Sequence, residues 1–200
     1  ACAPAYVAAW LTRTPSVIHE ANSVAGFANR LGARLSPHVA ITFSSTDLPG
    51  AHRIGMPLAR SITHPEQAPS PAEARAHFGL LPQKKTLVVT GGSQGARSVN
   101  ATIEASLGDL LATGWQVLHI VGAKNDVLEN PPKGYVALSY CDRMELAFGA
   151  ATAMVSRAGA ATVSEISLLG IPAIFVPYPV GNGEQEKNAR GSVDAGAALM

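Results

Sequence analysis

Ser156-Arg157-Ala158-Gly159-Ala160-Ala161-Thr162-Val163-Ser164-Glu165 decides the fold, because it is typical of a strand that turns directly into a helix. It follows the short apolar run of residues 153–155 and opens a pattern of apolar residues at helical spacing that ends at Gly170. Backbone N–H groups in the first turn of a helix lack partners within it, so the segment from Gly159 to Ala161 is suited to bind an anion. Glu165 lies further along this helix, where a carboxylate can accept hydrogen bonds from vicinal sugar hydroxyls. These features together indicate a nucleotide diphosphate.

Strand and helix patterns alternate along the rest of the chain. Residues 86–90 form a buried strand pattern that ends in a second glycine-rich turn, Gly91 to Ala96. Repeated alternation favours an α/β fold with parallel sheets covered by helices on both faces. We expect strands at residues 16–19, 39–43, 86–90, 115–121, 136–138, 153–155 and 173–176, with a further short strand reaching residue 54 and one starting near the end of the chain. We expect helices at residues 4–11, 24–35 and 71–78, from the glycine turn to residue 111, at residues 144–151, after Gly159, and at residues 184–193.

Glycine and proline residues mark a connection between two domains. Gly55-Met56-Pro57 and the proline-containing stretch that follows, up to Pro71, are typical of an interdomain linker. We therefore divide the chain into residues 1–58 and residues 59–200. Because the chain begins within an expected helix and stops where a strand would start, we expect a fragment with part of the first domain and most of the second.

The composition of this 200-residue chain excludes several classes of protein. A hydrophobic fraction of 47% with 14% charged residues fits a globular protein, and a net charge of +1 with scattered basic residues argues against nucleic-acid binding. Cys2 and Cys141 are too few and too far apart for a disulfide framework or a zinc site, so we expect two reduced thiols. The sequence has neither a signal-peptide pattern nor an apolar run of about 18 residues, the length that a membrane-spanning helix needs. It also has no Asp-x-Asp pair or carboxylate–histidine cluster at metal-ligand spacing, so we expect no metal.

The glycine turn Gly91-Gly92-Ser93-Gln94-Gly95 has two interpretations of equal weight. Its glycines can bring backbone amides close to a phosphate, with Ser93 adding a hydroxyl donor, or they can simply permit tight packing. The corner at Arg157 to Gly159 favours the first interpretation, since both turns of a doubly wound sheet lie at the carboxyl edge of their strands.

Other polar positions also have a functional and a structural interpretation. The pair His19-Glu20 stands at a strand end, where such a pair is more often structural than catalytic, and His119 within an apolar strand is expected to be a core residue. Arg157 can pair with phosphate or tie its corner to a neighbouring carboxylate. The loop of residues 177–185 carries amides and acids that suit sugar hydroxyls, although surface polarity alone also explains it.

Four segments, in order along essentially the whole chain, resemble the MurG family of peptidoglycan glycosyltransferases. They are His19-Glu20-Ala21-Asn22-Ser23-Val24-Ala25-Gly26, Gly91-Gly92-Ser93-Gln94-Gly95-Ala96-Arg97, Ser156 to Glu165, and Gly183-Glu184-Gln185 with Asn188-Ala189. The resemblance implies a GT-B architecture, in which two Rossmann-like domains with parallel sheets face a cleft. It further implies metal-free, inverting transfer of N-acetylglucosamine from UDP-N-acetylglucosamine to lipid I (undecaprenyl-diphospho-muramoyl-pentapeptide), which gives lipid II. Such an enzyme is peripheral, at the cytoplasmic face of the bacterial cell membrane.

The resemblance also implies a role for individual residues. For UDP, it assigns the ribose hydroxyls to Glu165, the uracil to the main chain of Cys141 with Met144 beside it, and the phosphates to Ser93 and the backbone of Ala160, Ala161 and Thr162. It places Gln94, Arg157 and Gly159 in the same nucleotide site. It assigns the N-acetylglucosamine to Gln185 and Asn188. On the acceptor side of the cleft it gives His19, Glu20 and Asn22 as the catalytic candidates.

The sequence departs from the family pattern at Glu184, where many relatives have glutamine, and at Ala59, where an arginine is usual and Arg60 comes one position late. The family's N-terminal glycine-rich loop would lie before residue 1, so we expect this fragment to bind UDP but to turn over weakly or not at all. The alternatives are another GT-B glycolipid glycosyltransferase and a non-catalytic UDP-sugar-binding fragment. A nicotinamide-dependent oxidoreductase fits less well, because the glycine fingerprint is imperfect.

Overall fold

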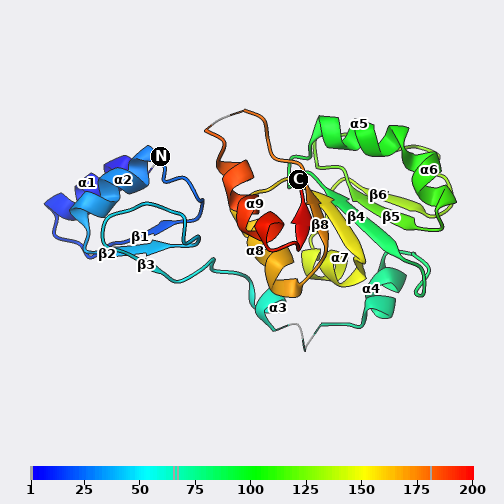
Figure 1. Cartoon of the computed structure of the whole chain (residues 1–200), viewed down its shortest axis with the longest axis horizontal. Helices are drawn as coiled ribbons and strands as arrows, with labels where there is room; N and C mark the ends of the chain where they lie inside the picture. Colours follow the sequence, from blue (N-terminus) through cyan, green and yellow to red (C-terminus); the bar gives the residue numbers. More distant parts are fainter. Residues whose placement is uncertain (1, 65, 67, 181) are drawn as a thin grey trace.

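In the computed structural model, residues 2–64, 66, 68–180 and 182–200 are described, and over these ranges the strands form two parallel sheets joined by one connecting segment (Figure 1). The smaller sheet has the strand order β1-β2-β3 and carries the helices of the N-terminal part. Its elements are α1 (Ala3–Leu11), β1 (Val17–Glu20), α2 (Phe27–Leu35), β2 (His38–Ile41) and β3 (Ala51–Arg53).

The larger sheet has the strand order β6-β5-β4-β7-β8-β9, and neighbouring strands are parallel. The chain runs outward from β4 to β6, returns to β7 beside β4, and then runs outward in the other direction. Ligands of open α/β sheets bind where the strand order reverses, which here is between β4 and β7. The elements are α3 (Arg60–Thr63), α4 (Pro71–His77), β4 (Thr86–Thr90), α5 (Arg97–Ala105), α6 (Leu107–Ala112), β5 (Gln116–Ile120), β6 (Tyr135–Leu138), α7 (Met144–Ala150), β7 (Ala153–Ser156), α8 (Ala160–Leu169), β8 (Ala173–Phe175), α9 (Glu184–Asp194) and β9 (Ala198–Leu199).

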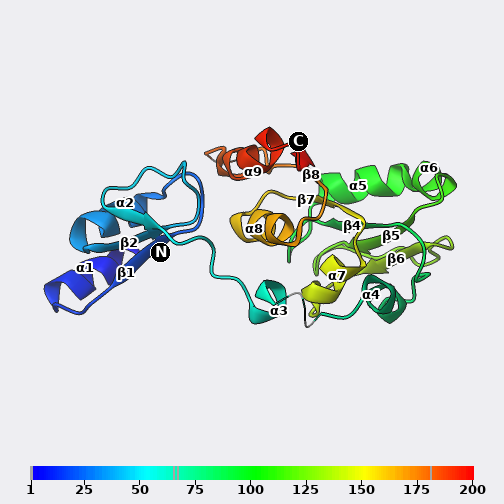
Figure 2. The ribbon, with the colours of Figure 1, turned by 60° about the horizontal axis from the view of Figure 1, so that its bottom comes forward.

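Helices cover both faces of the larger sheet, as the strand–helix alternation predicts (Figure 2). Successive side chains of a strand point to opposite faces, and Val88 and Val89 of β4 accordingly belong to different apolar clusters. The cluster of Val88 includes residues of α7 and α8, whereas the cluster of Val89 includes residues of α5 and α6. The α/β class and the parallel sheets are therefore confirmed.

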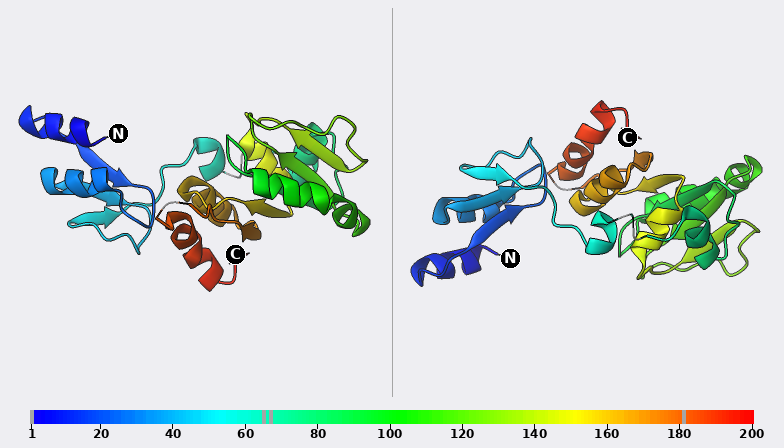
Figure 3. Two further views of the ribbon diagram at one scale, coloured as in Figure 1. Left: turned by 90° about the horizontal axis from the view of Figure 1, so that it is seen from above. Right: turned by 90° about the horizontal axis from the view of Figure 1, so that it is seen from below.

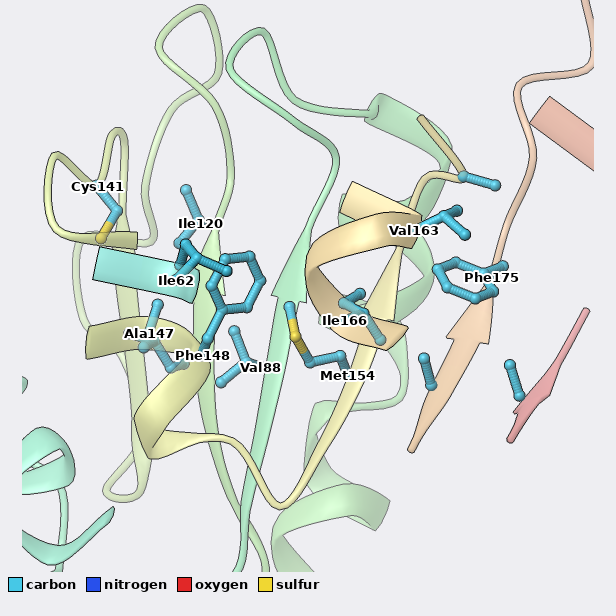
Figure 4. Packing of buried hydrophobic residues seen from close by; sticks show 14 of the residues in the cluster. Ile62, Val88, Ile120, Cys141, Ala147, Phe148, Met154, Val163, Ile166 and Phe175 are labelled. Carbon is cyan, nitrogen blue, oxygen red and sulfur yellow. The ribbon is translucent and has the colours of Figure 1, made fainter. Parts of the chain in front are cut away.

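The larger apolar cluster fixes α8 to the sheet. Ile166 of α8 packs with Met154 of β7 and Phe175 of β8, and all three side chains are buried (Figure 4). Burying a side chain of this size contributes about 1.5–3 kcal/mol. The first turn of α8 is consequently held in place at the end of β7.

Several element boundaries differ from the expectation. The helix expected at residues 24–35 begins only at Phe27, because the Gly26 N–H donates to Glu20 Oε2 (3.0 Å) and the preceding residues form a turn around that carboxylate. The long helix expected up to residue 111 is interrupted at Ser106, whose φ of −95° and ψ of 3° are not helical, so α5 and α6 are separate. The short strand β9 confirms the strand expected near the chain end.

The expected linker contains a helix that the sequence pattern did not predict. Helix α3 lies beside α8 (Figure 3), and its residue Ile62 belongs to the larger apolar cluster and is buried. Residues 65 and 67 of this linker lie outside the described residues. The division of the chain near residue 58 stays a prediction.

The core of the larger domain also contains a buried histidine. His119 of β5 has no exposed surface; its Nδ1 lies 2.9 Å from Tyr135 Oη and its Nε2 lies 3.1 Å from Asn100 Oδ1. Burial lowers the pKa of His119 from its ordinary value of 6.5 to about 4 and raises the pKa of Tyr135 to about 12, with a further contribution from the charge of Glu104. His119 is thus a core residue, as expected, and it is neutral in the folded state.

We predict that His119 makes the folded state sensitive to acid. Because the unfolded chain binds a proton at the ordinary histidine pKa of 6.5 while the folded chain does so only at about 4, the free energy of unfolding falls as the pH falls through this window. The contribution of His119 is fully present above the unfolded pKa, and its loss amounts to as much as about 3 kcal/mol. Urea unfolding at several pH values measures it. The substitution His119→Gln should flatten this part of the pH dependence, and an unchanged slope in that variant would show that another group is responsible.

Candidate functional site

The two glycine turns singled out from the sequence lie side by side at the switch point. Strand β4 pairs with β7 in the register Thr90↔Ser156, so the turn that follows Thr90 and the corner that follows Ser156 leave the sheet at the same edge. They then lead into α5 and α8. The arrangement brings two helix N-termini to one edge of the sheet.

Both helix N-termini present backbone donors that have no partner within their own helix. In α8 the N–H of Val163 is the first to bond within the helix, to the carbonyl of Gly159, so the N–H groups of residues 160–162 have no acceptor within the helix. In α5 the corresponding first bond runs from Asn100 N to Ala96 O. Within the described residues, no side chain caps either helix start. Donors of this kind, together with the helix dipole, attract a negative charge.

A cavity of about 590 Å³ lies at these two helix starts. Its lining comes from the ends of β4 and β7, from the first turns of α5 and α8, from the loop after β8 and from the start of α9. The lining residues are Thr90, Gly91, Gly92, Gly95, Ala96, Arg97, Ser98, Ser156, Arg157, Gly159, Thr162, Tyr178, Pro179 and Gln185. The cavity has room for a diphosphate with part of a sugar.

A second cavity, of about 210 Å³, adjoins the first, since Thr90, Gly92 and Thr162 line both. It brings together five residues that the resemblance assigned to UDP: Ser93, Cys141, Met144, Thr162 and Glu165. Ile120, Ser139, Tyr140 and Phe148 complete the lining with Thr90 and Gly92. Ser93 and Glu165 therefore face one space at the same edge of the sheet.

Glu165 is the acid of this second cavity. Burial raises its pKa above the ordinary value for glutamate. In the part of the chain that the structure describes, its carboxylate has no hydrogen-bonding partner, so its oxygens are free to accept from a ligand. Vicinal hydroxyls supply the donors that such a carboxylate needs.

The glycine turn is tightly packed at two of its glycines and open at a third. A Cβ at Gly91 would lie 2.3 Å from Ala96 N, and one at Gly95 would lie 1.9 Å from Val121 O, so these two glycines are required for packing. Gly92 has a φ of +85° and no heavy atom within 4 Å of the position of a Cβ, and it lines both cavities. Its backbone is accessible to a ligand.

Arg157 holds the walls of the first cavity together. Its Nη1 donates to the carbonyls of Val176 and Pro177 (3.0 Å each), and its Nη2 donates to Ser98 Oγ (3.1 Å). Its guanidinium also lies over the ring of Tyr178. The tie to a carboxylate, one of the two interpretations that the sequence left open, is replaced by ties to carbonyls and a hydroxyl, which connect the corner after β7 with the loop after β8 and the start of α5.

Gln185 and Asn188 of α9, which the resemblance assigned to the sugar, hold backbone groups in this structure. Gln185 Oε1 accepts from Ala158 N (3.2 Å) and Tyr178 N (2.9 Å). Asn188 is buried; its Oδ1 accepts from Ser23 N, and its Nδ2 donates to Asn22 Oδ1 and to Ala158 O. Asn188 therefore links the N-terminal part of the chain to the corner before α8.

The remaining expected site residues differ in their surroundings. Gln94 is absent from the lining of both cavities, and its side chain lies 3.4 Å from Lys124 Nζ. The Glu20 carboxylate is buried and accepts from Asn22 N, Gly26 N and Asn29 Nδ2, which corresponds to the structural interpretation of the His-Glu pair. His19 Nε2 lies 3.1 Å from Gly55 O.

Sequence reasoning missed two residues that line the first cavity, Thr90 and Ser98. Thr90 ends β4 and Ser98 stands in the first turn of α5, so their positions relative to the turn were the available signal. Tyr178 belongs to the loop of residues 177–185, for which the sequence left a functional and a structural interpretation open, and Gly181 of that loop lies outside the described residues.

The described residues contain no group of three or more His, Cys, Asp or Glu side chains placed to hold a metal ion. Across the same ranges of the chain, none of the helices combines the length and the apolar character needed to traverse a bilayer.

Comparisons with known proteins agree with this geometry. Residues 86–200 match the family model described as the glycosyltransferase family 28 C-terminal domain. The chain is 48% identical over its full length to a protein of Leifsonia xyli subsp. xyli and 50% identical to one of Clavibacter michiganensis subsp. michiganensis. Both carry the name UDP-N-acetylglucosamine–N-acetylmuramyl-(pentapeptide) pyrophosphoryl-undecaprenol N-acetylglucosamine transferase. The chain spans about half the length of these relatives, 56% and 55% respectively.

Solved structures give the same result. The crystal structure of Acinetobacter baumannii MurG matches 99% of this chain with a TM-score of 0.74 at 28% identity, and the match covers 56% of that protein. The glycosyltransferase of kitacinnamycin matches 86% of this chain and 43% of its own length, with a TM-score of 0.62 at 20% identity, and shares the fold. The resemblance to MurG is thereby confirmed. The family model matches more than half of the residues of this chain, and the chain therefore belongs to glycosyltransferase family 28.

Proposed function

We propose that the protein to which this chain belongs is an inverting glycosyltransferase. It transfers N-acetylglucosamine from UDP-N-acetylglucosamine to undecaprenyl-diphospho-muramoyl-pentapeptide, and the product is lipid II. The observation that carries the proposal is the pair of adjoining cavities at the switch point. The starts of two helices border the first cavity, and Glu165 borders the second. The names of the relatives at 48–50% identity support the same donor and acceptor.

The donor occupies both cavities in this proposal. Its diphosphate accepts hydrogen bonds from the backbone of residues 160–162 and from Ser93, while Glu165 accepts from the ribose hydroxyls. The uracil lies against the main chain of Cys141, with Met144 beside it. Support for this orientation comes from the order of the lining residues, since Thr162 borders both cavities and Glu165 follows it on the same helix.

The chemical step follows from this arrangement. The acceptor hydroxyl attacks the anomeric carbon from the face opposite the UDP, and the bond to the diphosphate breaks with inversion. Negative charge then develops on the departing diphosphate, where prearranged helix-end amides stabilise it without a metal. A general base takes the proton of the hydroxyl.

The acceptor side is formed in this proposal by residues 1–58, with residues 59–200 as the donor domain. That side includes His19, Glu20 and Asn22. The carboxylate of Glu20 accepts hydrogen bonds from three donors, which supports a role in shaping its loop. Gln185, which lines the first cavity, faces the sugar from the donor side, whereas the buried Asn188 joins the corner before α8 to the acceptor side. Because the acceptor is a lipid, we propose that the enzyme works at the cytoplasmic face of the cell membrane.

The direct test is transfer by the full-length protein. Purified enzyme incubated with radiolabelled UDP-N-acetylglucosamine and lipid I should give labelled lipid II and one UDP per transfer. Release of UDP without labelled lipid, or no reaction with fresh lipid I and a competent control enzyme, would contradict the proposal.

We predict that Glu165→Gln weakens UDP binding by about 10- to 100-fold, because a hydrogen bond to a charged group contributes about 1.5–3 kcal/mol. Isothermal titration calorimetry with UDP measures this loss. The exposed Glu129 provides the control, and Glu129→Gln should bind UDP like the wild type. Equal affinities in the wild type and Glu165→Gln would remove Glu165 from the site.

We predict opposite effects on stability and binding when a negative charge is placed at the start of α8. Ala161→Glu should raise the melting temperature slightly, because a carboxylate in the first turn interacts favourably with the helix dipole. The same charge should weaken UDP binding by roughly tenfold or more, because it repels the diphosphate. Ala161→Gln has almost the same size without the charge and serves as the control. If the glutamate and glutamine variants bind UDP equally, the diphosphate does not lie at this helix end.

A further inference from the structure

A chain of buried polar groups lies directly behind the glycine turn. It runs from Tyr135 Oη on β6 to His119 Nδ1 on β5 (2.9 Å), from His119 Nε2 to Asn100 Oδ1 on α5 (3.1 Å), and from Asn100 Nδ2 to the carbonyl of Val121 (2.9 Å). All of these residues are buried. The proposed transfer reaction uses none of these side chains.

In this chain of buried polar groups, the donor and the acceptor of each hydrogen bond can be assigned. Asn100 Nδ2 is the donor to Val121 O, so the amide oxygen of Asn100 faces His119 and can only accept. His119 therefore carries its proton on Nε2, and its Nδ1 accepts from the Tyr135 hydroxyl. Because burial keeps His119 neutral down to a pKa of about 4, this arrangement holds throughout the neutral range.

The chain of buried polar groups ends at the backbone that supports the glycine turn. The carbonyl of Val121 also accepts from Asn125 Nδ2 (2.9 Å), which donates to Gln94 O as well (3.1 Å). Gly95 and Gly122 are in such close contact that a Cβ at Gly122 would lie 2.2 Å from Gly95 N. Asn100 itself belongs to the first turn of α5, since its N–H bonds to Ala96 O. The amide of one side chain thus joins the start of α5 to the end of β5.

Apolar side chains would fill this part of the core at least as stably, since a buried polar network gains little net free energy over well-packed hydrophobic residues. What polar groups add is direction, because a hydrogen bond fixes one relative position of its partners. A shift of about 1 Å in a binding group is enough to reduce its function strongly.

We propose that Asn100, His119 and Tyr135 are positioning residues, which fix the first turn of α5 and the glycine turn at the distance from α8 that a diphosphate requires. This inference rests on the proposed function, in which the diphosphate lies between these two helix starts. In this proposal the three buried residues affect the binding of the phosphates. They do not affect the binding of the base and the ribose, which lie in the second cavity.

The test compares UDP with uridine in the wild type and in Asn100→Leu, at a temperature at which circular dichroism shows the folded state. Asn100→Leu should raise the Kd of UDP by about tenfold, the loss expected for one directional hydrogen bond, and change the Kd of uridine by less than about twofold. The control is Ile103→Ala, which removes a buried side chain one turn further along α5 without touching the polar chain. It should lower the melting temperature and leave both Kd values unchanged.

Tyr135→Phe keeps the test decisive if Asn100→Leu does not fold. It removes only the hydroxyl at the far end of the chain, and it should raise the Kd of UDP by about threefold with the Kd of uridine unchanged. Wild-type affinity for UDP in a folded variant, or an equal loss of UDP and uridine binding, would overturn the inference while leaving the proposed function intact. Failure of the wild type to bind UDP would instead contradict the proposed function.

Discussion

The pairing of β4 with β7 is the constraint on which the rest of the site depends. Because the strand order reverses there, two helices begin side by side at one edge of the sheet, and their first N–H groups lack partners within the helices. In the proposed function a diphosphate supplies several acceptors to these donors at once. The carboxylate of Glu165, about one turn further along α8, then accepts hydrogen bonds from the ribose hydroxyls. A nucleotide diphosphate is the ligand that we propose for this arrangement.

The two helices are held at this edge by different means. Apolar packing fixes α8, since Ile166 is buried with Met154 and Phe175. Helix α5 has apolar contacts through Val99 and Ile103, and it also has the directional contact of Asn100 with the end of β5. Arg157 connects the two by bonding to Ser98 Oγ from the corner before α8. Packing in the core therefore holds both helices, and the guanidinium of Arg157 connects their first turns.

Local patterns predicted the fold and the cavity, while long-range contacts decided the roles of individual side chains. Strand–helix alternation was sufficient for the parallel sheets, and the two glycine turns indicated where a cavity lies, because a doubly wound sheet brings such turns together. The sequence left open whether Glu20 is catalytic or structural. Its partner Gly26 lies within the range that was expected to be helical, so the contact between them could not be predicted. Asn188 could not be predicted to link two parts of the chain, since its partner Ser23 is 165 residues away. The break at Ser106 and the short helix α3 likewise carry no strong local signal.

A crystal structure of this chain with UDP bound tests the central claim most directly. The account predicts that diphosphate oxygens lie within hydrogen-bonding distance of the backbone N–H groups of residues 160–162, with the ribose hydroxyls on the Glu165 carboxylate. A UDP molecule bound elsewhere, or one in this cavity whose diphosphate points away from both helix starts, would contradict it.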